Sequence, residues 1–249
     1  PKGKKFTKLY LKYEEEGLAR RRVKARELWA EILKAQIETG TPYILYKDSA
    51  NNKSNQKNVG TIKSSNLCTE IIEYSDHKEQ AVCNLASIAL NRFVEIPSGQ
   101  VRSQNKSKRT YNFKKLEEVA YQVAINLNKV IDINFYPTKE TEKSNLRHRP
   151  VGIGVQGLAD TFVLMGHPFD SPEARSLNKE IFAAIYHGAM WASIHLARKE
   201  EPYSSFKGSP LSEGKLQFDL WGEEPSKEWD WGTLRKALLK YGARNSLLI

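Results

Sequence analysis

Apolar residues recur three or four positions apart in several stretches of the chain, the spacing of one face of an α-helix. One stretch runs from residue 28 to residue 37 and is followed by Gly40, a residue type that commonly ends helices. Others run from residue 116 to 127 and from 177 to 196. The apolar positions are Leu28, Trp29, Ile32, Leu33 and Ile37; Leu116, Val119, Ala120, Val123 and Leu127; and Leu177, Ile181, Ile185, Ala189 and Leu196. Each stretch is predicted to be a helix.

Polar residues mark the expected ends of further helices. Ser171, Pro172 and Glu173 supply a capping side chain, a proline tolerated in the first turn and an acidic group near the positive end of the helix dipole. The last of the stretches is therefore predicted to begin there. Shorter helices are predicted over residues 156–165 and 233–241, the second ending at Gly242.

Two short segments are predicted to be strands. Residues 43–46 are a short strand candidate, and residues 130–135 form a largely apolar run that could be a buried parallel strand. Residues 48–54 are rich in turn-forming types, which favours a loop over a helix. The chain is thus predicted to be mostly helical with short strands.

The residues with the most distinctive chemistry are Asn66, Cys68 and Glu70, with a second and last cysteine at Cys83. In an extended segment, alternate side chains point to the same side, so an amide, a thiol and a carboxylate would gather around one small substrate. The pattern leaves two interpretations open. The segment is either a catalytic tip, or a half-solvated strand with a small buried cysteine.

Composition is that of a globular domain. A chain of 249 residues with 40% hydrophobic content can bury a core, and it contains no apolar stretch long enough to span a bilayer. No signal-peptide core follows the lysine-rich start. A cytoplasmic location without membrane association is expected.

The formal net charge of +10 suggests a nucleic-acid-binding protein as one alternative function. Basic runs at residues 20–26 and 102–109 could contact phosphate groups. Neither run interleaves aromatic residues, and no helix-turn-helix, zinc-finger or RNA-recognition motif accompanies them. Nucleic-acid binding is therefore not expected.

A dinucleotide-dependent dehydrogenase is another alternative, because Gly152, Gly154 and Gly157 satisfy the G-x-G-x-x-G pattern. A dinucleotide site needs a strand that leads directly into the first glycine, and here a basic segment ending in Pro150 precedes it. These glycines are instead expected to let a helix pack closely on neighbouring backbone. The five histidines show no metal-ligand spacing, so no metal site is expected.

Several longer blocks extend through nearly the whole chain: residues 38–43, 46–49, 53–56, 65–71, 81–87, 147–160 and 244–249. In this order they resemble blocks of the large, catalytic subunit of class I ribonucleotide reductases. Several long blocks in the same order are more specific than one short motif. The resemblance implies an oxidoreductase that reduces ribonucleoside diphosphates to deoxyribonucleotides by thiyl-radical chemistry.

The resemblance also implies roles for single residues. Cys68 matches the transient thiyl radical that removes the 3′ hydrogen atom of the ribose, Glu70 the carboxylate that takes the 3′-hydroxyl proton, and Asn66 the amide that binds the sugar hydroxyls. These three residues and Leu67 are expected to contact the substrate. An ionised carboxylate can only accept hydrogen bonds, which suits a base, whereas an amide can both donate and accept. Cys83 matches one member of the redox-active pair, whose other member is absent from this chain.

The fold implied by the resemblance is an α/β barrel of ten strands, with a finger loop at about residues 60–85 that carries the radical cysteine. Residues 1–249 would form a helix-rich part of that catalytic barrel domain, with a possible inserted loop at residues 97–109. The family's N-terminal effector domain and C-terminal part have no matching stretch here. The chain is therefore expected to be a portion of a longer subunit, and inactive alone.

Partners implied by the resemblance are a ribonucleoside diphosphate substrate, a small subunit whose metal centre generates the radical, and thioredoxin or glutaredoxin as reductant. The complete enzyme would contain a dimer of large subunits. ATP and deoxynucleotide effectors would bind to regions outside this chain, which is expected to hold no cofactor itself.

Overall fold

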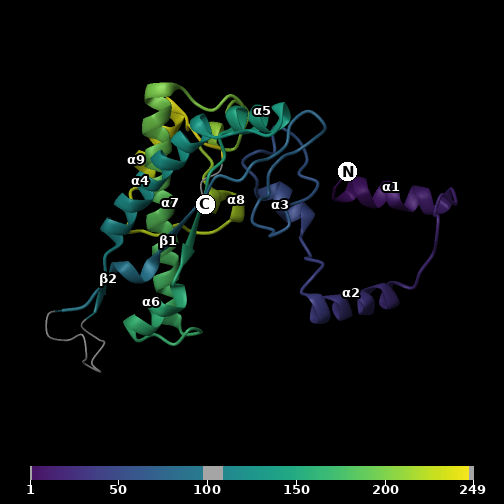
Figure 1. The fold of residues 1–249 in the computed structure, drawn as a ribbon, viewed down its shortest axis with the longest axis horizontal. Coiled ribbons are helices and arrows are strands. Elements are labelled where there is room, and N and C mark those ends of the chain that lie inside the picture. The colour runs from purple at the N-terminus through teal and green to yellow at the C-terminus, as the bar shows by residue number, and fades with distance from the viewer. Residues whose placement is uncertain (1, 98–108, 247–249) are drawn as a thin grey trace. The chain divides into compact units, whose positions relative to one another are not determined.

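The computed structural model describes residues 2–97 and 109–246, and the chain forms two compact units (Figure 1). One unit comprises Pro1–Tyr74 and the other Ser75–Ile249. Because the second unit contains most of the buried apolar residues, it holds the main hydrophobic core.

The first unit contains the helices α1 (Lys4–Glu15), α2 (Ala25–Thr39) and α3 (Lys47–Lys53). No residue of α1 or α2 is buried, so both helices leave their apolar faces exposed. The predicted helix over residues 28–37 is confirmed by α2. Gly40 ends it in the left-handed conformation, with a φ of 76°, and donates its N–H to Gln36 O.

Two predictions for this unit are wrong. Residues 48–54 are predicted to form a loop, but α3 covers most of them. The side-chain amide of Asn51 stabilises this helix through hydrogen bonds to the backbone. Its Nδ2 donates to Lys47 O and Ile62 O, both at 2.9 Å, and Ile62 N–H donates back to Asn51 Oδ1 at 2.8 Å. Residues 43–46 form neither a strand nor a helix, and no neighbouring strand pairs with them among the described residues.

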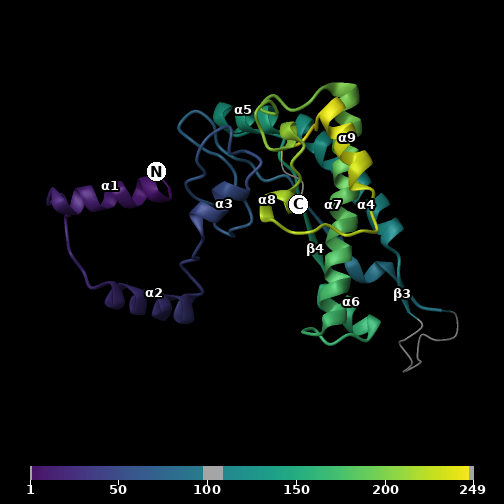
Figure 2. The ribbon, with the colours of Figure 1, turned by 180° about the vertical axis from the view of Figure 1, so that it is seen from behind.

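The second unit contains most of the regular structure (Figures 1 and 2). Its elements are β1 (Leu85–Ala89), η1 (Leu90–Phe93), β2 (Val94–Glu95), β3 (Thr110–Tyr111), α4 (Phe113–Ile133), α5 (Lys139–His148), β4 (Gly152–Gln156), α6 (Leu158–Met165), α7 (Pro172–Glu200), η3 (Leu211–Glu213), α8 (Gln217–Trp221) and α9 (Trp231–Tyr241).

The described strands form two small sheets. β1 pairs in parallel with β4, and β2 pairs antiparallel with β3. The described part of the chain is therefore a helix-rich α/β structure, and no closed barrel is present in it. The possible insertion at residues 97–109 lies almost wholly outside the described residues.

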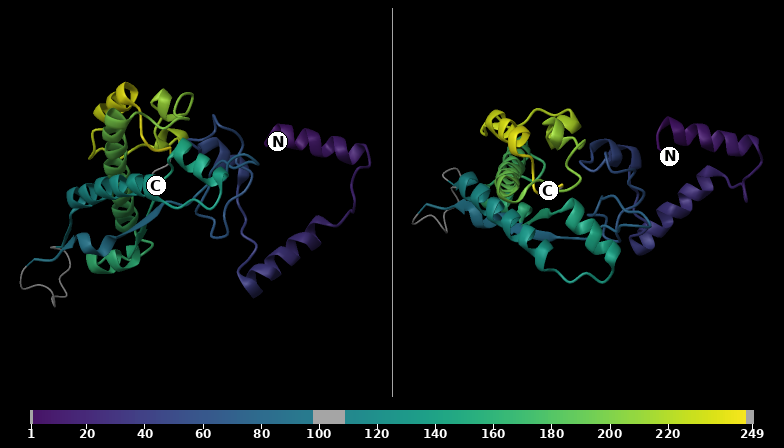
Figure 3. Two further views of the ribbon diagram at one scale, coloured as in Figure 1. Left: turned by 45° about the horizontal axis from the view of Figure 1, so that its top comes forward. Right: turned by 90° about the horizontal axis from the view of Figure 1, so that it is seen from above.

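The core of the second unit lies where the long helices α4 and α7 pack against each other, crossing as the teal and green helices in the left view of Figure 3. Gly188 lies at this contact. A Cβ atom at that position would lie 2.3 Å from Glu117 O, so only glycine permits the observed approach of the two backbones.

Most helix predictions for this unit are confirmed. α4 covers the second apolar stretch, and α7 begins after Ser171, whose side chain accepts a hydrogen bond from Ala174 N at 3.1 Å. α9 begins earlier than predicted, at Trp231, because Asp230 caps it, and it ends at Gly242 as expected.

The strand predicted over residues 130–135 is wrong. Residues up to Ile133 continue α4, and Ile133 and Phe135 are 82% and 85% exposed. A short apolar run does not by itself distinguish a strand from the last turn of a helix.

The helix predicted over residues 156–165 is confirmed by α6, but the glycines before it have a different local structure from the one expected. Gly152 and Gly154 lie inside β4, and Gly157 precedes α6, which begins at Leu158 (Figure 2). A Cβ atom on Gly152 would lie 2.6 Å from Leu85 Cδ2. The first glycine therefore permits close packing beside β1, and the motif does not form the glycine-rich loop of a dinucleotide site.

Candidate functional site

Asn66, Cys68 and Glu70 lie in a tight turn and not in an extended segment, so the expected alternation of side chains is wrong. Thr69 N–H donates to Asn66 O at 3.3 Å, which closes the turn. Thr69 has a φ of 75°. A β-branched residue rarely adopts this left-handed conformation, which costs about 1–3 kcal/mol.

The Asn66 side chain holds the turn together. Its Oδ1 accepts hydrogen bonds from Ile71 N–H at 3.0 Å and from Ser65 Oγ at 3.3 Å. These bonds join residues on both sides of Cys68. The amide therefore fixes the backbone of the loop that carries the thiol.

The side chains at the tip of this turn are accessible. Cys68 and Glu70 are exposed, and Leu67 is 83% exposed. An exposed thiol and an exposed carboxyl group two residues away can each approach a small molecule or a covering protein surface. Neither Cys68 nor Cys83 forms a disulfide.

Glu73 follows the turn and has the opposite environment. Its side chain is buried, and desolvation raises the pKa of its carboxyl to about 8. It is therefore mostly protonated at neutral pH. Sequence reasoning missed this residue, because nothing in its neighbours distinguishes a buried glutamate from a solvated one.

Cys83 is an exposed residue of the second unit and comes just before β1. Asn84, next to it, is buried and donates from Nδ2 to Asn145 Oδ1 at 2.5 Å and to Pro150 O at 2.8 Å. Gly152 N–H donates to Asn84 O at 2.8 Å. The residue after the thiol is thus fixed to both α5 and the start of β4.

An ion pair between Glu79 and Arg147 lies upstream of Cys83 in the sequence. The buried carboxylate of Glu79 accepts two hydrogen bonds of 3.0 Å from Arg147 Nη1, and His148 Nε2 lies 3.4 Å from Glu79 Oε1. His148 Nδ1 lies 2.6 Å from Ser205 Oγ. Burial lowers the pKa of His148 and outweighs Glu79, which raises it. The net effect favours a neutral imidazole.

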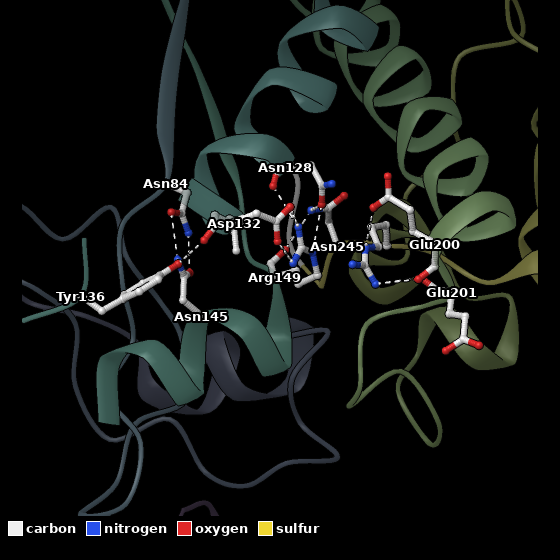
Figure 4. A network of polar contacts seen from close by, with 11 residues as sticks. Asn84, Asn128, Asp132, Tyr136, Asn145, Arg149, Glu200, Glu201 and Asn245 are labelled. Atoms are coloured by element: carbon white, nitrogen blue, oxygen red, sulfur yellow. Dashed lines mark hydrogen bonds and ion pairs between the residues drawn. The ribbon is translucent and has the colours of Figure 1, made fainter. Parts of the chain in front are cut away.

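A second polar network surrounds Arg149, which has a φ of 45° (Figure 4). Its guanidinium forms a bidentate pair with Asp132 at 2.7 and 2.9 Å and donates to Asn128. Asn245 Nδ2 donates to Arg149 O at 3.0 Å and to Asn128 Oδ1 at 3.3 Å. These bonds fix the end of the described chain beside α4.

The expected site residues are divided between the two units. Asn66, Leu67, Cys68 and Glu70 lie together in the turn of the first unit. Cys83 belongs to the second unit, where α5 contacts its segment. The supporting residues on α5 were not expected from the sequence.

The described residues contain no cluster of three or more histidine, cysteine, aspartate or glutamate side chains suited to a metal ion. Within the same residues, no helix is both long enough and apolar enough to cross a membrane. The basic run at residues 102–109 lies almost entirely outside them.

Comparisons with known proteins identify the family. The family model described as "Ribonucleotide reductase, barrel domain" matches residues 1–249. The large subunit of ribonucleoside-diphosphate reductase from Arabidopsis thaliana is 56% identical over 99% of this chain and 31% of its own length. The Caenorhabditis elegans large subunit is 58% identical over 99% of this chain and 30% of its own length. A large chain from Saccharomyces cerevisiae is 54% identical over 98% of this chain and 27% of its own.

The chain thus spans about 30% of the length of the curated relatives that it matches. These matches do not support the nucleic-acid-binding and dehydrogenase alternatives, and they agree with the resemblance of the blocks. The chain belongs to the ribonucleotide reductase family and matches its barrel domain.

Proposed function

We propose that this chain is part of the catalytic barrel of a ribonucleoside-diphosphate reductase, which converts ribonucleotides to deoxyribonucleotides for DNA synthesis. The observation that carries the proposal is the exposed thiol of Cys68, placed between Asn66 and Glu70 in a turn, in a chain of this family. The substrate would be a ribonucleoside diphosphate.

The first step takes place at the turn. The Cys68 sulfur, as a thiyl radical, removes the 3′ hydrogen atom of the ribose and becomes a thiol. Glu70 accepts the proton of the 3′ hydroxyl, because an ionised carboxylate near a hydroxyl is a suitable base. Asn66 binds the sugar hydroxyls while its Oδ1 keeps the turn in shape.

The second step uses Cys83 and a second thiol outside this chain. The two thiols form one S–S bond and release two electrons and two protons. The 2′ carbon takes up these electrons and one of the protons to form a C–H bond, and the other proton leaves with the 2′ hydroxyl as water. The Cys68 thiol then returns its hydrogen atom to the 3′ carbon, and Glu70 returns its proton to the 3′ oxygen.

Exposure of the turn fits a role inside a larger protein. A thiyl radical is lost in water or on contact with oxidants, so the tip must be enclosed when it acts. The relatives are about three times longer than this chain, which leaves room for the covering parts of a barrel. We expect residues 60–85 to form the finger loop at its centre.

The radical would come from a small subunit that holds the metal centre, as the relatives' description as large subunits suggests. A thioredoxin or glutaredoxin would reduce the disulfide after each turnover, and the large subunits would form a dimer. A cytoplasmic enzyme of this kind would bind its nucleotide effectors outside the present chain.

The roles of the two cysteines can be separated in the complete enzyme. Cys68→Ala is expected to abolish both isotope exchange at the 3′ position and deoxynucleotide formation. Cys83→Ala is expected to retain 3′ exchange and to prevent full reductive turnover, because the second thiol then has no partner. Loss of both signals to the same extent in both variants would contradict these roles.

A further inference from the structure

The segment that carries Cys83 has no regular structure, yet α5 holds it on both sides of the thiol. Upstream, Gln80 N–H donates to Glu140 O at 3.1 Å. Downstream, Asn84 pairs with Asn145, further along the same helix. The exposed Cys83 therefore lies between two residues, Gln80 and Asn84, that are both hydrogen-bonded to α5.

The downstream contact is a reciprocal pair of amides. Asn84 Nδ2 donates to Asn145 Oδ1 at 2.5 Å, and Asn145 Nδ2 donates to Asn84 Oδ1 at 3.2 Å. Asn84 and Asn145 are 4% and 0% exposed, so water does not compete for these bonds. A buried pair that satisfies both its donors and its acceptors has one favoured geometry.

Tyr136 fixes Asn145 in turn. Its hydroxyl accepts a hydrogen bond from Asn145 Nδ2 at 2.6 Å and donates to Ile131 O at 2.5 Å (Figure 4). The order of contacts thus runs from the backbone of α4 through Tyr136 and Asn145 to the neighbour of Cys83.

We propose that Asn145 is a positioning residue for Cys83: through Asn84, it aims the thiol at its redox partner. The proposal rests on the proposed redox role of Cys83. Disulfide formation requires the two Cβ atoms to come within about 3.5–4.5 Å, so a small backbone rotation at residue 84 would misplace the sulfur. The radical step at Cys68 does not depend on that direction.

The test uses the complete enzyme with Asn145→Ala, which removes both hydrogen bonds to Asn84. Deoxynucleotide formation is expected to fall by about tenfold to a hundredfold, the effect of displacing a reacting group by about 1 Å. Isotope exchange at the 3′ position is expected to stay within about twofold of wild type. Lys143→Ala, an exposed change on the same helix, is the matched control and leaves both rates unchanged.

A second readout reports on the thiol itself. The rate of Cys83 alkylation by iodoacetamide, followed by peptide mass spectrometry in the reduced enzyme, is expected to change in Asn145→Ala and not in Lys143→Ala. Cys68 alkylation should remain at the wild-type rate in both. A purely structural loss would instead lower the folded fraction, reduce 3′ exchange and deoxynucleotide formation together, and change the alkylation rate of Cys68 as well as that of Cys83.

Tyr136→Phe provides a milder variant if Asn145→Ala does not fold. It removes only the hydroxyl that Asn145 contacts, and a smaller fall in deoxynucleotide yield is expected, again without loss of 3′ exchange. Parallel loss of both activities, or wild-type turnover in Asn145→Ala, would overturn the proposal.

The outcome for Cys83→Ala separates this proposal from the proposed function. If Cys83→Ala keeps a normal deoxynucleotide yield, the redox role of Cys83 fails and the positioning role fails with it. If Cys83→Ala loses that yield while Asn145→Ala keeps it, the redox role stands and only the positioning role is overturned.

Discussion

The two cysteines are held in opposite ways. The turn around Cys68 is closed by bonds among its own neighbours, from Ser65 to Ile71. The segment around Cys83 depends on a partner 61 residues away in the sequence, because Asn84 pairs with Asn145 on α5. A local turn can keep its shape while the rest of the protein changes, whereas a distant anchor makes the second thiol sensitive to the packing of the whole unit.

This difference suits the two proposed roles. The radical thiol has to present one atom to a small substrate, and a short loop with a fixed tip is sufficient. The redox thiol has to meet a second sulfur within narrow distance limits. A buried scaffold restricts its direction more strongly than a surface loop would.

The largest effect is expected from weakening the polar network around Arg149 in the second unit, the unit that holds the Cys83 segment. Asp132→Ala leaves the guanidinium of Arg149, a side chain only 4% exposed, without its ion partner. Unfolding free energy is expected to fall by about 3 kcal/mol, the lower end for a broken buried pair, because Asp132 itself is 47% exposed. Urea unfolding of the complete subunit measures this loss.

The control for this change is Lys129→Ala, an exposed position on the same helix α4, which should alter stability by less than about 0.5 kcal/mol. Equal stability of the Asp132 and Lys129 variants would mean that the Arg149 network does not support the unit.

An intermediate effect is expected from Glu73, the buried carboxyl that follows the turn around Cys68. Burial raises the pKa of Glu73 to about 8, above its ordinary value of 4.5. The contribution of protonated Glu73 to the free energy of unfolding is therefore fully present below about pH 4.5 and is lost as the pH rises towards 8. Glu73→Gln should remove this decline and raise the unfolding free energy at pH 7 by about 2–3 kcal/mol.

Unfolding curves at several pH values test the Glu73 prediction. Glu38→Gln, which changes an exposed carboxyl of the same unit, should keep the wild-type pH dependence. An unchanged slope in Glu73→Gln would show that the decline comes from other groups.

The smallest effect is expected at the turn itself. Thr69→Gly should relieve the left-handed conformation at a φ of 75° and stabilise the folded state by about 1 kcal/mol or less, because glycine also loses more chain entropy on folding. Isotope exchange at the 3′ position should fall modestly as the turn loosens. A clear loss of stability in thermal unfolding would argue against strain at Thr69.

Sequence reasoning succeeded where local rules determine the structure. The cap at Ser171 and the apolar spacing of α7 predicted a long helix, and Gly40 predicted the end of α2. It failed where the environment decides. Asn51 stabilises α3 by bonding to Ile62, a contact that no local composition rule contains.

The candidate site shows the same division. The resemblance proposed roles for residues in the turn around Cys68, but it did not predict the bend at Thr69, which only the folded chain reveals. Asn145 could not be found, because α5 contains almost no apolar residues and the partner of Asn145 lies far away in the sequence. Buried pairs of ordinary polar residues carry no signature in a single sequence.

The missing side chain at Gly188 has a consequence for the whole polar network. It lets α7 approach the backbone of α4 at Glu117, and these same helices supply Ser193 and Asn128, which hold Asn245 from either side. Glycine at position 188 therefore sets the distance between α4 and α7, and this distance allows the side-chain amide of Asn245 to bond to both helices.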